Sequence, residues 1–366
     1  MVEKTKIPSL GDRLELILEV GRAFSSVLNI DVLLNLIADH TADILNADRC
    51  SIFVVDAGKN KLWTRAAMGE GRIEIPADTG IAGAVAATGE IINVPDAYAD
   101  NRFNKDIDRA TGYKTENLLA GPMTNINGDI IGVFQVLNSK NRVFSRDDEQ
   151  LLSALSGFAG NALENSLLYE ELKRTFNSMV EVLAATIDAK HPYTAGHTAR
   201  VAEYSCGIAR EMGLDEAQIE ILRIAAYLHD YGKIGIKDVV LTKPGKLTDE
   251  EYLEMKSHAA KTREILSKMH FERKFKDIPL IAGSHHEKFD GSGYPQKLSG
   301  ESIPLGARIM AIADVFDALT SDRDYRKAMP FNKAVELMKK EVGAAFDPRI
   351  FPFFENYFQK ELNDQS

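Results

Sequence analysis

The 366-residue sequence has only two cysteines, Cys50 and Cys206, which lie far apart and lack metal-type spacing. We therefore expect no disulfide framework, and so little cysteine is typical of a reducing compartment such as the cytoplasm. No apolar run approaches the roughly 18 residues of a membrane span. The apolar run Leu14–Val20 is broken by Glu15 and Glu19, which argues against a signal peptide. These absences favour a cytoplasmic protein with no membrane partner.

Positive charge is also scarce, because 44 Lys and Arg against 54 Asp and Glu give a formal net charge of −10. A nucleic-acid polymer is bound mainly by neutralising its phosphates, so no such partner is expected. A small phosphate ligand remains compatible, since bound metal cations can reverse the charge of a site. With 45% hydrophobic and 27% charged residues, the composition is that of a globular protein long enough for two domains.

The first half of the sequence predicts an α+β domain with an antiparallel sheet. One helix is expected within the first 30 residues and a second at Asp31–Leu45, with its first residue as N-cap. The runs expected to be strands are Arg49–Asp56, Leu62–Met68, Arg72–Ile75, Ile91–Val94, Leu118–Thr124 and Ile130–Asn138. Asn127-Gly128 between the last two runs is a strong hairpin signal. A helix at Ile81–Thr88 and a long polar segment, Asp96–Glu116, complete this half, and the latter is a candidate binding loop.

A long helix is expected over Ser145–Ala189, where its first residue and Asp148 fit a capping box. Its apolar stripe, Leu151–Leu183, is too long for one domain to bury. We therefore expect part of the helix to pack on the same helix of a second chain in a parallel homodimer. The alternative is two helices with a break at Gly157 or Gly160.

The remaining sequence predicts an all-α half in which loops rich in Gly, Pro and Lys separate the helices. The expected helices are Thr198–Met212, Asp215–Asp230, Asp249–Met269, Ile278–Glu287, Leu305–Ser321, Lys333–Val342 and Phe351–Phe358.

This helical half also concentrates residues suited to binding metal ions. The candidates are His197, His229, Asp230, His258, His285, His286 and Asp314. Imidazole and carboxylate ligands without thiolates favour Fe, Mn, Ni, Co or Zn over Ca. Adjacent helical residues such as His229 and Asp230 point about 100° apart, but two neighbouring ions could each take one, with the aspartate as a bridge. Two ions roughly 3.5–4 Å apart activate a water and steady the leaving oxygen of a phosphodiester. Each residue alone could be an ordinary core or surface residue, whereas the whole set favours a metal centre.

Three strings, HDYGKIGI, HHEKFDGSGYP and ADVFDALTSDRDYR, resemble the HD-GYP family of cyclic di-GMP phosphodiesterases, and the resemblance covers about residues 175–366. It implies that the seven histidines and aspartates are metal ligands and that Lys233 contacts the scissile phosphate. Asp230 and Lys233 are accordingly the candidate catalytic residues, since an ammonium can neutralise charge developing on phosphoryl oxygens. It also implies that Asp317, Arg323 and Arg326 lie near the substrate, where an arginine fork suits phosphate recognition.

The namesake loop of that family corresponds to Gly291, Gly293, Tyr294 and Pro295. Its glycines allow close backbone approach, and Tyr294 could stack or hydrogen-bond near a guanine. A merely rigid turn is the alternative for this loop.

The sequence departs from the family pattern at Tyr193, where some members carry a glutamate that helps to hold a third metal. A neutral phenol is a poor replacement, so we expect two divalent ions, Fe or Mn, and the linear dinucleotide pGpG as the main product rather than GMP. Alternatively, water or another side chain completes a third site.

Residues 11–165 resemble a GAF domain, most clearly in NRFNKDIDRATGYKTENLLAGPM and IIGVFQVLN. Six residues are similar to a motif of the GAF domains in mammalian cyclic-nucleotide phosphodiesterases: Asn101, Arg102, Phe103, Phe144, Asp148 and Glu149. Arg102 replaces the lysine of that motif. Because the motif supports the pocket more than it touches ligand, a cyclic nucleotide, another small ligand and ligand-free dimerisation all stay open. Trp63 and Phe134 are expected in the core.

The sequence therefore predicts an α+β protein with a GAF sensory domain at 1–160, a linker helix at 161–180 and an HD-GYP phosphohydrolase domain at 181–366. The expected function is metal-dependent hydrolysis of cyclic di-GMP under control of the GAF domain. Two alternatives are hydrolysis of another cyclic dinucleotide such as cyclic GMP-AMP, and an inactive module that binds cyclic di-GMP.

Overall fold

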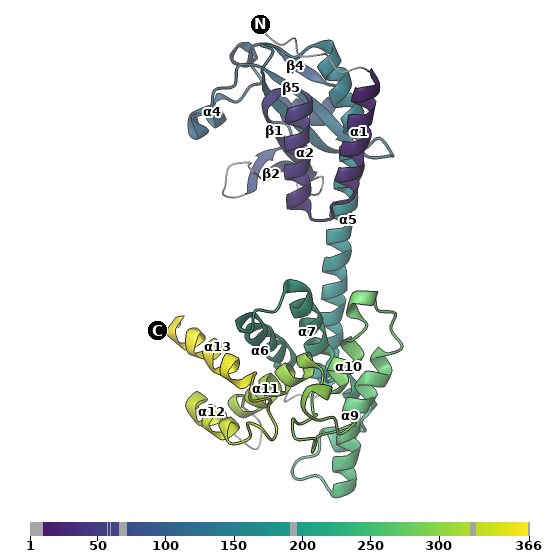
Figure 1. Cartoon of the computed structure of the whole chain (residues 1–366), viewed down its shortest axis with the longest axis vertical. Coiled ribbons are helices and arrows are strands. Elements are labelled where there is room, and N and C mark those ends of the chain that lie inside the picture. The colour runs from purple at the N-terminus through teal and green to yellow at the C-terminus, as the bar shows by residue number, and fades with distance from the viewer. Residues whose placement is uncertain are drawn as a thin grey trace. The chain divides into compact units, whose positions relative to one another are not determined.

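The computed structural model describes residues 10–56, 58, 60–65, 72–190, 196–322 and 327–364. The chain divides into two compact units, Met1–Lys173 and Arg174–Ser366 (Figure 1). The first unit combines a sheet with helices and the second is helical, so the expected fold class is confirmed. Among the helices of the described ranges, none combines the length and the apolar character needed to span a bilayer.

The first unit is built on a six-stranded antiparallel sheet in the order β3-β2-β1-β6-β5-β4. The strands are β1 (Ala47–Asp56), β2 (Lys61–Arg65), β3 (Arg72–Pro76), β4 (Ile92–Val94), β5 (Leu118–Thr124) and β6 (Ile130–Ser139). All six expected strands are confirmed with small shifts at their ends, although residues 66–68 lie outside the described ranges. The β5–β6 hairpin turns through Gly128, whose φ of +86° suits a residue without a Cβ.

Helices cover both faces of this sheet. They are α1 (Leu10–Ser25), α2 (Ile30–Ile44), α3 (Gly80–Thr88), η1 (Ala97–Ala99), α4 (Lys105–Thr111) and the first part of α5 (Arg146–Lys190). One core joins α1, α2 and α5 to the sheet and buries Trp63 and Phe134, as expected; a second core lies under α3.

One expectation for this unit was wrong. The N-cap of α2 is Asn29, which has the extended backbone of a cap and accepts hydrogen bonds from the backbone N–H groups of Asp31 and Val32. The candidate binding segment Asp96–Glu116 contains η1 and α4, which are too short for helical periodicity to reveal.

Helix α5 is unbroken over 45 residues, so the alternative of two shorter helices is wrong. Its capping box is confirmed, because Ser145 N–H donates to Asp148 Oδ2 at 2.7 Å and Asp148 N–H donates to Ser145 Oγ at 3.3 Å. Gly160 does not break the helix. A Cβ there would lie 2.1 Å from the carbonyl oxygen of Thr124, so the glycine allows α5 to pack closely on β5.

The second unit is helical around one core. Its elements after α5 are α6 (His197–Glu211), α7 (Glu216–Leu228), η3 (Tyr231–Gly235), α8 (Asp238–Leu241), α9 (Asp249–Leu266), η4 (Arg273–Phe275), α10 (Ile278–Gly283), η5 (Gly300–Ser302), α11 (Leu305–Thr320), α12 (Phe331–Lys339) and α13 (Phe351–Asp364). The core joins α6, α7, α10, α11 and the last two helices. Helices α7 and α10 end earlier than expected, which places the His-Asp and His-His pairs beyond helix ends.

Candidate metal centre

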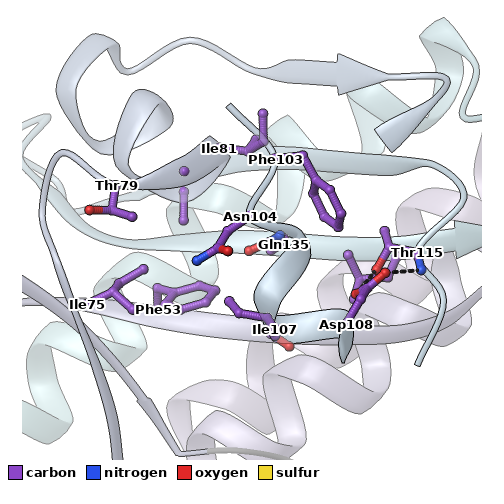
Figure 2. Close-up of a pocket in the computed structure, with 14 residues that line it drawn as sticks. Phe53, Ile75, Thr79, Ile81, Phe103, Asn104, Ile107, Asp108, Thr115 and Gln135 are labelled. Atoms are coloured by element: carbon purple, nitrogen blue, oxygen red, sulfur yellow. Dashed lines mark hydrogen bonds between the residues drawn. The ribbon is translucent and has the colours of Figure 1, made fainter. Parts of the chain in front are cut away.

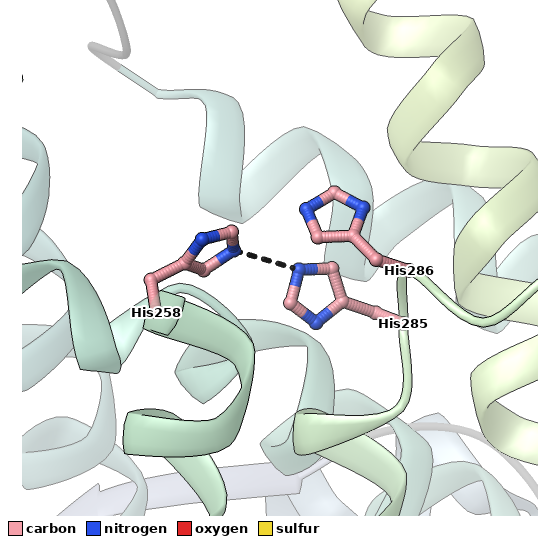
Figure 3. A group of neighbouring side chains, drawn as sticks. All are labelled: His258, His285 and His286. Carbon is pink, nitrogen blue, oxygen red and sulfur yellow. Dashed lines mark hydrogen bonds between the residues drawn. The ribbon is translucent and has the colours of Figure 1, made fainter. Parts of the chain in front are cut away.

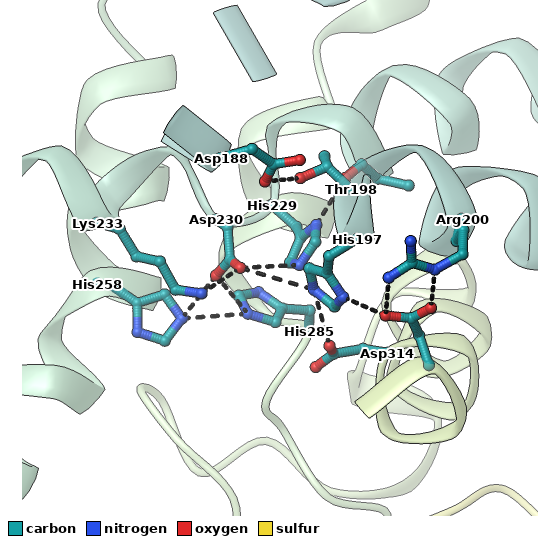
Figure 4. A network of polar contacts seen from close by, with 12 residues as sticks. Asp188, His197, Thr198, Arg200, His229, Asp230, Lys233, His258, His285 and Asp314 are labelled. Carbon is teal, nitrogen blue, oxygen red and sulfur yellow. Dashed lines mark hydrogen bonds and ion pairs between the residues drawn. The ribbon is translucent and has the colours of Figure 1, made fainter. Parts of the chain in front are cut away.

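The seven candidate metal ligands come together from five elements of the second unit. His197 begins α6, His229 and Asp230 follow α7, His258 lies within α9, His285 and His286 follow α10, and Asp314 lies within α11. Figure 4 shows six of these side chains pointing toward one another. Both adjacent pairs lie just after the last residue of a helix, and ligand atoms of both members of each pair take part in the centre.

Hydrogen bonds fix which nitrogen of each imidazole faces the centre. The Nδ1 atoms of His229, His258 and His285 each lie 2.6–2.7 Å from the carbonyl oxygen three residues earlier. A carbonyl oxygen only accepts, so Nδ1 carries the proton and Nε2 keeps a free lone pair. The Nδ1 atom of His197 donates in the same way to Asp317 Oδ2 at 2.7 Å. Metal-binding histidines are generally oriented by such partners.

These Nε2 atoms converge on Asp230. Its Oδ1 lies 3.3 Å from Nε2 of His258 and 4.0 Å from Nε2 of His285. Its Oδ2 lies 3.4 Å from Nε2 of His229 and 3.8 Å from Nε2 of His197. The two carboxylate oxygens thus face two different sets of imidazoles, as a bridging carboxylate would.

The donor set fits a cation. Nε2 of His258 and Nε2 of His285 face each other at 3.3 Å (Figure 3), although both carry lone pairs and neither can donate. Nε2 of His229 is buried and has no hydrogen-bond partner among the described residues. Buried acceptors in this arrangement are costly unless a positive ion shares them. Three overlapping groups have ligand atoms within 4.8 Å of one another: His258, His285 and His286; His197, His229 and Asp314; and His229, Asp230 and His285.

Burial keeps most of these imidazoles neutral, which is the form that binds metals. It lowers the pKa of His258, lowers that of His285 strongly, and lowers that of His286 to about 3. Burial alone would raise the pKa of Asp230, but the Lys233 ammonium, 2.5 Å from its Oδ2, and nearby imidazoles hold that pKa well below its usual value. The centre therefore offers neutral imidazoles at His258, His285 and His286 and an ionised central carboxylate.

His197 differs because two carboxylates flank it. Burial disfavours its charged form, but hydrogen bonds to Asp314 and Asp317 outweigh burial and raise the pKa of His197 to about 9. Its Nε2 lies 3.3 Å from Asp314 Oδ1, so a proton is shared there when no cation is bound. A metal ion at this position would replace that proton.

Asp317 lies behind His197. Its side chain is 1% exposed and its oxygens accept hydrogen bonds from His197, Arg200 and Ser321. The position near the substrate that the resemblance implies stays a prediction. Arg200, which sequence reasoning missed, donates its Nε–H to Asp317 Oδ1 at 2.5 Å. Its position three residues after His197, on the same face of α6, was the available signal.

A close backbone contact joins η3 to α9. A Cβ on Gly232 would lie 2.0 Å from the carbonyl oxygen of His258 and 2.5 Å from the backbone nitrogen of Thr262. The hydroxyl of Thr262, also missed from the sequence, accepts from Gly232 N–H and donates to the carbonyl oxygen of His229, both at 2.8 Å. This contact sets the position of the His229-Asp230 pair relative to His258.

The loop after His286 folds back on itself. A Cβ on Gly293 would lie 2.3 Å from the backbone nitrogen of Lys288, so this glycine allows close approach of backbone segments within the loop. The ring of Tyr294 lies 4.8 Å from that of His286. Buried Glu287 accepts hydrogen bonds from two backbone N–H groups of the loop, another role that the sequence did not reveal. Arg323, Arg326 and Tyr193 lie outside the described residues.

The first unit contains a separate small cavity of about 100 Å³, bordered by α3, α4 and the sheet (Figure 2). Its lining is mainly apolar, with Thr79, Asn104 and Gln135 as polar groups. Of the six motif residues, only Phe103 is among the residues that line the cavity. Arg102 forms an ion pair with Asp100, Phe144 is buried and Asn101 is exposed. Asp148 caps α5, and Glu149 accepts a hydrogen bond from the side chain of Asn93.

Comparison with known protein families finds one domain in each half of the chain. Residues 29–163 match the GAF domain and residues 181–350 match the HD domain. The chain thus joins a GAF domain to an HD domain, a metal-dependent hydrolase fold, and the resemblance inferred for each half is confirmed.

Three curated relatives each match about half of the chain. The chain is 46% identical to 3'3'-cGAMP-specific phosphodiesterase 3 of Vibrio cholerae, over 47% of this chain and 37% of that protein. It is 42% identical to the cyclic di-GMP phosphodiesterase response regulator RpfG of Xanthomonas campestris, over 51% and 50%. It is 38% identical to 3'3'-cGAMP-specific phosphodiesterase 2 of Vibrio cholerae, over 56% and 39%. The chain spans half or less of the length of each.

Proposed function

We propose that the HD domain hydrolyses one phosphodiester bond of cyclic di-GMP and releases mainly linear pGpG. The observation that carries this proposal is the position of Asp230, whose two oxygens face two sets of inward-pointing imidazoles. A pure binding module has no need of such a cluster. The names of the relatives support a cyclic dinucleotide as the substrate class.

Each residue of the centre has a part in this reaction. Two divalent ions, Fe or Mn, would be held by His197, His229 and Asp314 on one side, by His258, His285 and His286 on the other, and by Asp230 between them. When bound, such ions supply Lewis-acid activation of water and phosphate. The Lys233 ammonium stands beside Asp230 and can donate to a phosphoryl oxygen as its negative charge grows. Asp317 and the backbone carbonyls keep the imidazoles oriented.

A second candidate substrate is 3'3'-cGAMP, because the relative with 46% identity is named for that compound. It carries the same two phosphates as cyclic di-GMP and differs in one base. Initial rates with both compounds at equal concentration separate the two candidates. We expect faster turnover of cyclic di-GMP, and a clear preference for 3'3'-cGAMP would reverse the assignment.

The activity test uses protein purified anaerobically, loaded with Fe or Mn, and assayed by metal analysis and product chromatography. We expect two ions per chain and accumulation of pGpG. Asp230→Ala should lose turnover and bound metal while its helical content persists, because Asp230 lies between α7 and η3 and its side chain caps neither element. Full metal loading without turnover of either cyclic dinucleotide would favour the inactive binding module instead.

We also propose that the GAF domain binds a small ligand in its cavity and that the protein dimerises through α5. The cavity, at about 100 Å³, favours a ligand smaller than a nucleotide.

The proposed dimer contact lies along α5. The exposed residues Leu168, Leu172, Met179 and Val182 follow one another at spacings of four, seven and three residues. Such spacing is typical of a coiled-coil seam, so the same helix of a second chain is the proposed partner.

A further inference from the structure

An ammonium group lies between two tyrosine rings beside the candidate metal centre. Tyr252 and Lys256 are four residues apart on α9 and therefore share a face. The Lys256 Nζ atom lies 4.5 Å from the centre of the Tyr252 ring and 5.0 Å from the centre of the Tyr294 ring. Both distances are within the range of cation–π attraction, about 6 Å. The two rings thus hold the end of a flexible side chain in one place.

Tyr294 connects this ammonium to the metal centre. Its ring lies 4.8 Å from the ring of His286 at an interplanar angle of 37°, and its backbone N–H donates to the carbonyl oxygen of His286 at 3.2 Å. Burial, together with nearby acidic groups including Asp314 and Asp230, raises the pKa of Tyr294 and keeps its hydroxyl protonated. Lys256 therefore stands at the rim of the centre rather than on a remote surface.

The Lys256 ammonium is available to bind an anionic group. No carboxylate of the described residues lies within 4.0 Å of its Nζ atom, whereas Lys233 is paired with Asp230 and Arg200 with Asp317. An ammonium held by ring faces keeps its N–H groups for other acceptors, because the rings attract it without accepting strong hydrogen bonds.

The charge of the substrate indicates what this group binds. A cyclic dinucleotide carries two phosphates in one ring, each with a negative charge. Lys233 and the metal centre would face the phosphate that is cleaved, so the other phosphate needs a second cation nearby. A compact ammonium suits a single phosphate oxygen, whereas the planar guanidinium of an arginine suits two.

We propose that Lys256, positioned by Tyr252 and Tyr294, binds the uncleaved phosphate of the cyclic dinucleotide. The proposal rests on the phosphodiesterase function proposed above. It makes Lys256 a residue that selects substrates with two phosphates over simple phosphodiesters.

The test compares Lys256→Met in the full-length, metal-loaded protein with two substrates. Cyclic di-GMP has the second phosphate, and bis(p-nitrophenyl) phosphate has only the scissile one. We expect the KM for cyclic di-GMP to rise about 10-fold or more, as for loss of a charged hydrogen bond. We expect kcat, metal content and turnover of bis(p-nitrophenyl) phosphate to stay within about 2-fold. Lys268→Met removes an exposed lysine paired with Glu264 and should change nothing.

Each other outcome also decides the question. An unchanged KM for cyclic di-GMP overturns the proposal, as does an equal loss on both substrates accompanied by loss of metal. Weakened binding of cyclic di-GMP but not of cyclic di-AMP would assign Lys256 to a guanine instead of a phosphate. If the wild-type protein binds cyclic di-GMP without cleaving it, the proposed function fails. The Kd of Lys256→Met, measured by calorimetry, then still tests the contact.

Discussion

Replacing Asp317 with asparagine tests whether the orientation of His197 matters for the metal centre. The carboxylate of Asp317 only accepts, so it requires the proton of His197 to sit on Nδ1, 2.7 Å away. An asparagine amide can donate instead, which permits the other tautomer and removes the free lone pair from Nε2. The substitution also removes the charge that pairs with Arg200.

The size of the effect follows from the role of such orienting partners. Removing the hydrogen-bond partner of a metal-binding histidine typically costs 10–100-fold in metal affinity or activity, which corresponds to about 1.4–2.7 kcal/mol. Asp317 is 1% exposed and meets His197 at a short distance, so water cannot easily take its place. We expect Asp317→Asn to weaken metal binding by a factor in this range.

The assay is a competition titration of bound Mn against a chelator, with thermal unfolding measured in parallel. Asp347→Asn is a matched control, because Asp347 is equally buried and pairs with Arg308 at 2.6 Å but contacts none of the candidate ligands. Both variants should unfold at lower temperature, and only Asp317→Asn should lose metal affinity. Equal metal affinity in the wild type and both variants would refute the reasoning about tautomers.

Three further outcomes follow from the structure. Gly232→Ala should destabilise the metal-free protein by about 1–3 kcal/mol in denaturant unfolding, because its methyl group meets the backbone of α9; an unchanged midpoint would show that η3 can shift. Removing metal with a chelator should lower the thermal midpoint, since an ion at 100 times its Kd stabilises the folded state by about 2.7 kcal/mol; a midpoint insensitive to chelator would contradict a metal centre. Met179→Glu should convert a dimer to a monomer in light scattering, whereas Lys268→Met should not; a wild-type monomer would exclude the α5 seam.

The sequence predicted well what depends on residue type and local periodicity. The strands of the first unit have clear apolar runs, and the seven candidate ligands stand in strings whose residue types leave few other interpretations. The ends of α7 and α10 were predicted too late, because apolar periodicity continues through His229 and His286, beyond the last helical residues Leu228 and Gly283.

What the sequence did not predict depends on contacts between distant segments. Gly160 was a possible helix break by composition, yet it serves the contact of α5 with β5. Thr262 and Gly232 are thirty residues apart and acquire their roles only when α9 packs on η3. The position of Asp317 behind His197 likewise depends on the packing of α11 against α6, which no local pattern encodes.

The contact between Gly232 and α9 has a consequence for how the centre meets its ions. Steric repulsion between backbone atoms is much stiffer than a hydrogen bond, so the separation of the His229-Asp230 pair from His258 varies little with conditions. The ligand side chains then lose their conformational freedom when the chain folds, so ion binding does not carry the entropic cost of ordering them. The metal-free protein should accordingly keep its candidate ligands in the same arrangement, and metal should rebind in a single step without refolding.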